Sequence, residues 1–96
     1  MSTAYRSARA ETDLTEIWTS IAGDDPSAAE GLLDRIDQVC ALLATHPRAG
    51  KRRDDLAAGL RFYPVGNYLV FYVPRNDGIA VARILHGGRD YRQEFR

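Results

Sequence analysis

The sequence predicts an α+β fold in which an N-terminal antiparallel helical hairpin packs on a small antiparallel sheet of three or four strands. Three features indicate it. Apolar residues in the first half recur at steps of three and four, as on one face of a helix. From Leu60 onward the period is two, which is typical of strands. Gly66-Asn67 and Asn76-Asp77-Gly78 then read as hairpin turns between those strands.

The first helix is predicted over residues 8–22, after a short strand at residues 4–7. Ser7 suits the N-cap because its hydroxyl can accept a hydrogen bond from a free amide of the first turn. The apolar positions at helical spacing are Leu14, Ile17, Trp18 and Ile21. We expect Trp18 to lie in the core against the sheet. Gly23-Asp24-Asp25 ends the helix.

The second helix is predicted over residues 26–45. Asp25 can cap it, and Pro26 fits the first helical position, where the missing N–H costs nothing. Its apolar face is formed by Ala29, Leu32, Leu33, Ile36, Val39, Cys40 and Leu43. His46-Pro47 ends the helix. Two helices joined by so few residues should form an antiparallel hairpin.

The second half of the chain is predicted to form the sheet, with strands at residues 60–65, 68–73 and 79–86. Pro64 limits the hydrogen bonding of the first of these strands. Residues 48–59 should be an exposed connection, and the segment from Gly87 onward a turn and a short helix. The predicted order of elements is β-α-α-β-β-β.

Length and composition set limits on the function. A chain of 96 residues has room for one domain, residues 1–96, and its 45% hydrophobic and 27% charged residues are those of a folded protein. Thirteen basic and thirteen acidic side chains cancel, which argues against a nucleic-acid coat protein. The charges are nevertheless divided: residues 1–47 hold eight acids and three arginines, whereas residues 48–96 hold five acids and ten basic residues.

Cysteine use and hydropathy indicate the compartment. The single cysteine, Cys40, cannot form an intramolecular disulfide, which fits a reducing compartment. Neither a secretory signal nor an apolar run of membrane-spanning length is visible, so we expect a soluble, cytoplasmic protein. Two isolated histidines and one cysteine make no metal site, and no Gly-rich phosphate loop occurs, so we expect no cofactor.

Several short signatures occur in order along nearly the whole chain. They are Tyr5-Arg6-x-Ser-x-x-Ala, Asp13-Leu14-x-x-Ile17-Trp18, Pro47-x-x-Gly50, Gly59-Leu60-Arg61, Tyr68-Leu69-Val70-Phe71-Tyr72 and Arg83-Ile84-Leu85-His86-Gly87-Gly88-Arg89-Asp90. Together with the order of elements, they resemble the ParE branch of the RelE/ParE toxin superfamily. Gly31 departs from the pattern, because glycine inside a helix costs about 1 kcal/mol relative to alanine.

The resemblance implies the toxin of a type II toxin–antitoxin pair. A ParD-like antitoxin would dock onto the toxin through an extended tail of helix and strand and form a hetero-oligomer with it. ParE-type members poison DNA gyrase by binding, without sequence-specific contact to nucleic acid. RelE-type members share the fold but cleave mRNA at the ribosome. We therefore predict a gyrase-binding toxin, with an mRNA endonuclease or a non-toxic antitoxin-binding remnant as alternatives.

Six residues are predicted to contact the target or the antitoxin: Arg61, Tyr72, Arg83, His86, Arg89 and Asp90. The endonuclease alternative would use four of them in catalysis, namely Arg61, Arg83, His86 and Arg89. His86 could transfer protons near neutral pH. However, residues 56–85 contain no glutamate, lysine or second histidine to pair with it. Under the leading prediction there are no catalytic residues.

Structural roles are also open for several of these side chains. Arg83 stands in phase with apolar strand residues, so it could pair with a carboxylate or reach solvent past the sheet edge, besides binding a partner. Tyr68 and Tyr72 share one strand face and should be half-buried. The basic residues of the connection, Arg48, Lys51, Arg52 and Arg53, could contact phosphates or simply be solvated.

Overall fold

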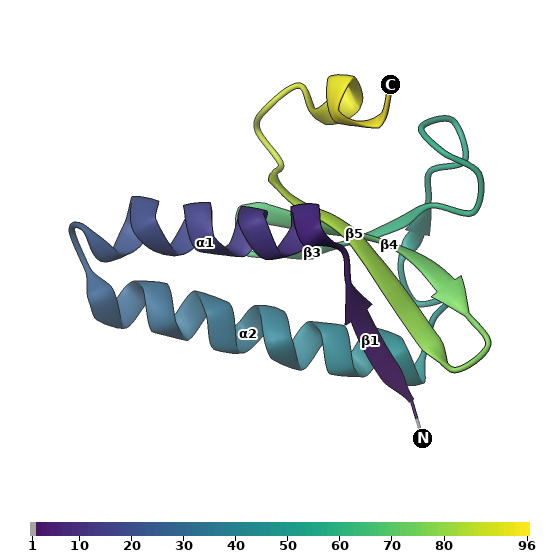
Figure 1. Cartoon of the computed structure of the whole chain (residues 1–96), viewed down its shortest axis with the longest axis horizontal. Coiled ribbons are helices and arrows are strands. Elements are labelled where there is room, and N and C mark those ends of the chain that lie inside the picture. The colour runs from purple at the N-terminus through teal and green to yellow at the C-terminus, as the bar shows by residue number, and fades with distance from the viewer. Residues whose placement is uncertain (1) are drawn as a thin grey trace.

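A computed structural model describes residues 2–96 (Figure 1). The elements are β1 (Thr3–Arg6), α1 (Ala8–Ala22), α2 (Pro26–Thr45), β2 (Lys51–Arg52), β3 (Arg61–Val65), β4 (Tyr68–Arg75), β5 (Gly78–His86) and the 3₁₀-helix η1 (Tyr91–Phe95). The α+β class and the helical hairpin are confirmed. Within the described residues, no helix is both long enough and apolar enough to cross a membrane.

Both helices begin and end where the sequence predicts, and both predicted caps form. The Ser7 hydroxyl accepts a hydrogen bond from the Ala10 amide at 3.0 Å. The Asp25 carboxylate accepts one from the Ala28 amide at 3.1 Å. These bonds satisfy amides that have no partner inside the helix, which is why local sequence sets the two boundaries so well.

The sheet differs from the prediction in strand number and direction. It has five strands in the order β1-β5-β4-β3-β2. Four neighbouring strands pair antiparallel, but β1 runs parallel to β5, with Thr3 opposite Gly78 and Arg6 opposite Val81. A parallel pair needs a long connection, and the helical hairpin with the following strands supplies it. The prediction of a three- or four-stranded, purely antiparallel sheet was therefore wrong in these two respects.

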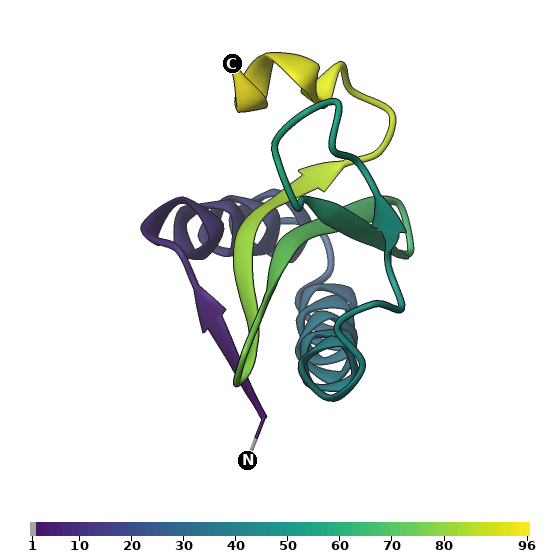
Figure 2. The same ribbon diagram turned by 90° about the vertical axis from the view of Figure 1, so that its right-hand side faces the viewer.

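The helices cover one face of the sheet. Their buried residues pack with the inward side chains of the strands, among them Ile17, Ile36, Leu43, Val70, Tyr72, Ile79, Val81 and Ile84. Figure 2 shows the hairpin on one side of the sheet and the C-terminal segment on the other.

A second, smaller core lies on the opposite face of the sheet. Leu60, Phe71 and Leu85 are buried there. The Tyr91 and Phe95 rings of η1 pack on the Phe71 ring, with centroid distances of 5.2 and 4.9 Å. The sheet is therefore the middle layer of three, and the last residues of the chain close its outer face.

Two aromatic residues are buried differently from the prediction. Trp18 is only half-buried and lies outside the main core, because Leu14 and Ile17 fill the position facing the sheet. Tyr72 is completely buried, whereas Tyr68 is half-buried as predicted. The predicted connection at residues 48–59 contains the short strand β2, which pairs with β3.

Candidate functional site

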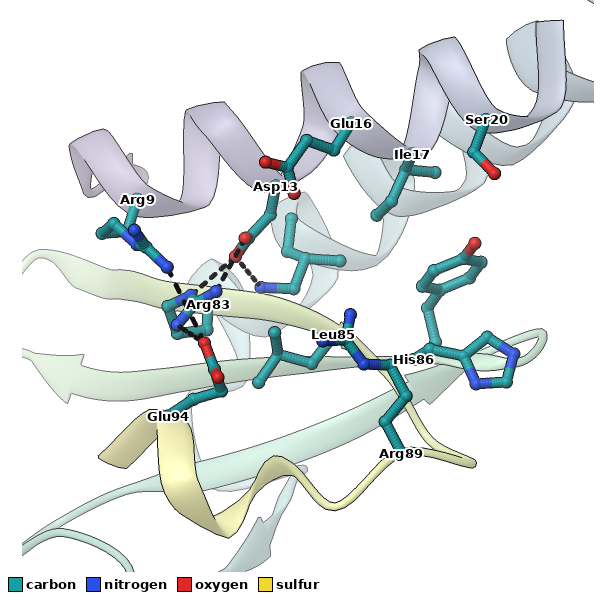
Figure 3. Close-up of a pocket in the computed structure, with 12 residues that line it drawn as sticks. Arg9, Asp13, Glu16, Ile17, Ser20, Arg83, Leu85, His86, Arg89 and Glu94 are labelled. Atoms are coloured by element: carbon teal, nitrogen blue, oxygen red, sulfur yellow. Dashed lines mark hydrogen bonds and ion pairs between the residues drawn. The ribbon is translucent and has the colours of Figure 1, made fainter. Parts of the chain in front are cut away.

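A pocket of about 310 Å³ opens between α1, β5 and the C-terminal segment (Figure 3). Three of the predicted site residues line it: Arg83, His86 and Arg89. The other lining residues are Arg9, Asp13, Glu16, Ile17, Ser20, Tyr68, Ile84, Leu85 and Glu94. The pocket therefore contains both acidic and basic side chains.

A buried ion pair between Asp13 and Arg83 forms one wall. The Asp13 carboxylate accepts hydrogen bonds from Arg83 Nε at 2.8 Å, from Arg83 Nη2 at 2.9 Å and from the Ile84 backbone amide at 2.9 Å. The two side chains are only 6% and 11% exposed. The hydrogen bond to Asp13 raises the pKa of Arg83 further above its usual value. Of the roles left open for Arg83, the structure shows the pairing with a carboxylate.

Sequence reasoning did not identify Asp13 as a site residue, although a signal was present. Ala10, Asp13, Leu14 and Ile17 are all buried and occupy one face of α1. An acid at helical spacing within an apolar stripe must find a partner, because burying an unpaired charge is very costly. The partner could not be named, since it lies 70 residues further along the chain.

The C-terminal segment joins the same network. Glu94 Oε1 accepts a hydrogen bond from Arg83 Nη1 at 2.7 Å and lies 3.7 Å from Arg9 Nη2. All three nitrogens of the Arg83 guanidinium thus donate to carboxylates. The network links α1, β5 and η1.

His86 and Arg89 lie beyond the ion pair, at the end of β5. His86 Nδ1 accepts a hydrogen bond from the Gly88 amide at 3.0 Å, and its ring packs edge-on against the Tyr68 ring at 5.3 Å. Arg89 is exposed and extends from the following turn along the pocket (Figure 3). Asp90 is not in the pocket lining, but its carboxylate caps η1 by accepting a hydrogen bond from the Arg92 amide at 3.3 Å.

The remaining two predicted residues, Arg61 and Tyr72, lie elsewhere and hold the loop after α2. The Tyr72 hydroxyl donates to the Pro47 carbonyl at 2.7 Å and accepts from the Gly50 amide at 2.8 Å. Burial raises the pKa of Tyr72, so this hydroxyl stays protonated. Arg61 Nη1 donates to the Gly50 carbonyl at 2.7 Å. The six predicted residues therefore fall into two groups on different parts of the molecule.

Gly50 is required by this arrangement. A Cβ at this position would lie 2.5 Å from the Tyr72 hydroxyl and 2.7 Å from the Phe62 carbonyl oxygen. Only glycine lets the loop approach the sheet this closely.

A separate groove lies along the helical hairpin and has a volume of about 430 Å³. It is lined by Arg6, Glu11, Leu14, Thr15, Trp18 and Leu33. Trp18 contributes a half-exposed aromatic surface to it. Across residues 2–96, no cluster of three or more His, Cys, Asp or Glu side chains is placed to hold a metal ion.

Comparison with known proteins gives a consistent set of similarities. A family model described as the ParE toxin of the parDE type II toxin–antitoxin system matches residues 5–91. Toxin ParE3 of Caulobacter vibrioides is 32% identical over 76 residues, which cover 78% of this chain and 76% of that protein. A solved structure of a chromosomal ParDE system from P. aeruginosa is 18% identical, with a TM-score of 0.74 over 90% of this chain and 96% of the other.

Proposed function

Because this chain belongs to the ParE family of toxins from type II toxin–antitoxin systems, we propose that it arrests growth by binding DNA gyrase and that a ParD-like antitoxin neutralises it. It would act without catalysis, in the cytoplasm, where gyrase works on the chromosome. The family membership rests on the match over residues 5–91 and on the Caulobacter relative. The mode of action rests on the geometry of the predicted site.

The observation that carries the proposal is the engagement of Arg83. Cleavage of RNA needs cationic groups that are available to the phosphate, beside an acid and a base. The Arg83 guanidinium already donates from all its nitrogens to Asp13 and Glu94. Binding an RNA phosphate would require breaking this buried network. A structural arginine at this position favours a toxin that acts by binding over one that acts by catalysis.

The other residues of the endonuclease alternative do not converge with Arg83 on one phosphate. Arg61 holds the loop after α2 and is absent from the lining of the pocket with His86 and Arg89. His86 uses Nδ1 to accept the Gly88 amide. We therefore assign target contact to His86, Arg89 and Asp90, which lie together on the surface around the end of β5. Arg61, Tyr72 and Arg83 would support the fold of the contact surface.

The groove along the hairpin is the place where we propose the antitoxin binds. Apolar helical partners bind in grooves of this kind by inserting side chains at helical spacing. Trp18 and Leu33 supply apolar surface there, and Arg6 and Glu11 supply charge at its rim. A ParD-like helix with an extended tail could occupy the groove and continue onto the sheet.

The first test compares gyrase and ribosome. Purified wild-type protein should inhibit gyrase supercoiling, and Arg89→Glu should weaken the inhibition at least tenfold, because it reverses a charge at the proposed contact. Arg96→Glu changes another exposed C-terminal arginine by the same charge and should have little effect. Site-specific cleavage of mRNA on ribosomes, with no effect on gyrase, would favour the endonuclease. If the protein expressed without antitoxin neither inhibits gyrase nor cleaves mRNA, the result would favour a non-toxic remnant.

The second test concerns the antitoxin. Co-expression with a ParD-like protein encoded beside this chain should yield a co-purifying complex. Trp18→Glu should weaken that complex about a hundredfold or more, because it places a charge in the groove. Leu42→Glu makes the same kind of change at a leucine that is 44% exposed on α2 and is not among the groove residues, and it should be tolerated. Equal effects of the two variants would contradict the proposed docking position.

A further inference from the structure

Positive charge without acidic partners gathers at one corner of the molecule. Arg48, Lys51, Arg61 and Arg75 come from the loop after α2, from β2, from β3 and from the end of β4. We call these four residues the basic corner. Within residues 2–96, none of them has a carboxylate oxygen within 4.0 Å. The same is true of Arg35, Arg89, Arg92 and Arg96, which belong to α2 and to the segment after β5.

The members of the basic corner are neighbours in space. Arg61 Nη1 donates to the Arg48 carbonyl at 3.2 Å, so these two residues touch. Lys51 directly follows Gly50, whose carbonyl oxygen accepts a hydrogen bond from Arg61 Nη1. Arg48 and Arg75 line one hollow of about 660 Å³ together with His46, Pro47, Ala49, Pro74 and Asn76. No acidic side chain is part of that lining.

The rest of the molecule is charged in the opposite sense. Residues 8–45, which are the two helices and their turn, hold eight acids and only two arginines. The basic corner lies where the loop after α2 meets the end of β4 and the edge pair of β2 and β3. The positive charge of Arg75 is partly balanced. Its guanidinium lies over the Tyr5 ring, and the Tyr5 hydroxyl donates a hydrogen bond to the nearby Asp77 carboxylate. Arg48 and Lys51 are both exposed.

We propose that the basic corner binds the phosphate backbone of duplex DNA without reading its sequence. Arg48 and Arg75 each present a guanidinium, whose planar fork of donors matches phosphate oxygens, while Arg61 adds positive charge and holds the loop with Nη1. Its cations come from four separate segments, so they can engage several phosphates at once. The hollow contains no Phe, Tyr or Trp on which an unpaired base could stack, which disfavours single-stranded nucleic acid. The proposed surface is separate from the gyrase contact at β5 and does not depend on it.

The proposal predicts weak, salt-dependent binding. Non-specific protein–DNA contacts have Kd values of about 10⁻⁴–10⁻⁶ M at physiological salt, and the logarithm of the association constant falls by about 0.9 per phosphate for each logarithmic unit of salt. Fluorescence anisotropy of the purified protein with a labelled 20-base-pair duplex, measured over a salt series, gives both quantities. Two duplexes of unrelated sequence should bind equally.

Charge reversal locates the surface. Arg48→Glu/Lys51→Glu should weaken DNA binding at least tenfold and reduce the salt slope by about 2, because two phosphate contacts are lost. Each of the two single variants should show a smaller loss of DNA affinity and a smaller decrease of the salt slope. The matched control is Arg35→Glu, at an exposed arginine of α2 among the acidic residues of the helices. It changes the charge by the same amount as either single variant, and it should bind DNA within about twofold of the wild type. Circular dichroism of each variant checks that the fold is kept.

Four outcomes would overturn the proposal: no binding to duplex DNA at low salt, equal losses in the Arg35 and Arg48 single variants, tighter binding to single-stranded RNA than to the duplex, or displacement of the DNA by polyglutamate at matched charge. The last would assign the basic corner to an acidic protein segment. The DNA-binding assay contains no gyrase, so a negative result in it does not bear on the proposed inhibition of gyrase. In the same way, a negative supercoiling assay does not bear on DNA binding by the basic corner.

Discussion

Removing the Asp13 carboxylate should destabilise the protein more than any other single change of charge. In Asp13→Asn the side chain keeps its volume but loses its charge and one acceptor oxygen, while the Arg83 guanidinium and the Ile84 amide stay buried around it. Removing one partner of a buried ion pair costs about 3–5 kcal/mol. Because Glu94 still balances part of the arginine charge, we expect a value near 3 kcal/mol.

This loss is large compared with the whole stability of the chain. A protein of 96 residues has a free energy of unfolding of about 5–15 kcal/mol. Urea unfolding can be followed by the fluorescence of Trp18, the single tryptophan. The matched control is Asp34→Asn on the exposed side of α2, which should stay within about 0.5 kcal/mol of the wild type.

A loss below about 1 kcal/mol in Asp13→Asn would contradict a structural role of this ion pair, because a buried acceptor of three hydrogen bonds cannot be that weakly coupled. A double-mutant cycle with Arg83→Met gives a second check. If the two residues act as a pair, the double variant should lose clearly less stability than the sum of the single losses.

Three further predictions concern other parts of the fold. Gly31→Ala should raise the free energy of unfolding by about 1 kcal/mol, since alanine favours the helix and the added methyl group meets no atom within 4 Å; a loss in urea unfolding would contradict this. Tyr72→Phe should cost about 1–3 kcal/mol, because the Pro47 carbonyl and the Gly50 amide lose their partner; an unchanged melting temperature would argue against that role. Cys40 should react with a disulfide reagent far more slowly in the folded protein than in urea, because it is 3% exposed and burial raises the pKa of its thiol; complete labelling of the native protein within the mixing time would show an open structure.

The parts of the fold that local sequence determines could be predicted well. Ser7 and Asp25 make short-range capping bonds, so both helix boundaries follow from a few neighbouring residues. The hairpins after β3 and β4 follow from their turn residues for the same reason. The pairing of β1 with β5 depends on residues 75 positions apart, and alternation along a strand carries no information about the direction of its partner.

The candidate site shows the same division. Arg83 could be recognised as an arginine in need of a carboxylate, but three elements had to be placed before Asp13 and Glu94 could be identified. Tyr72 was expected to be half-buried, because its strand face was known but the loop that covers its hydroxyl was not. Trp18 was expected in the core because it shares the helical spacing of the apolar residues of α1, yet Leu14 and Ile17 fill the space against the sheet.

The parallel strand β1 affects how the protein is made. It is made before the other elements of this sheet, yet its partner β5 follows about 75 residues later along the chain, as the pairing of Thr3 with Gly78 shows. At about 5–20 residues per second, several seconds pass between the two. During this time the helical hairpin has no complete sheet to pack on. The sheet therefore cannot be completed before β5 has been made, and any activity that needs the finished sheet is withheld until then.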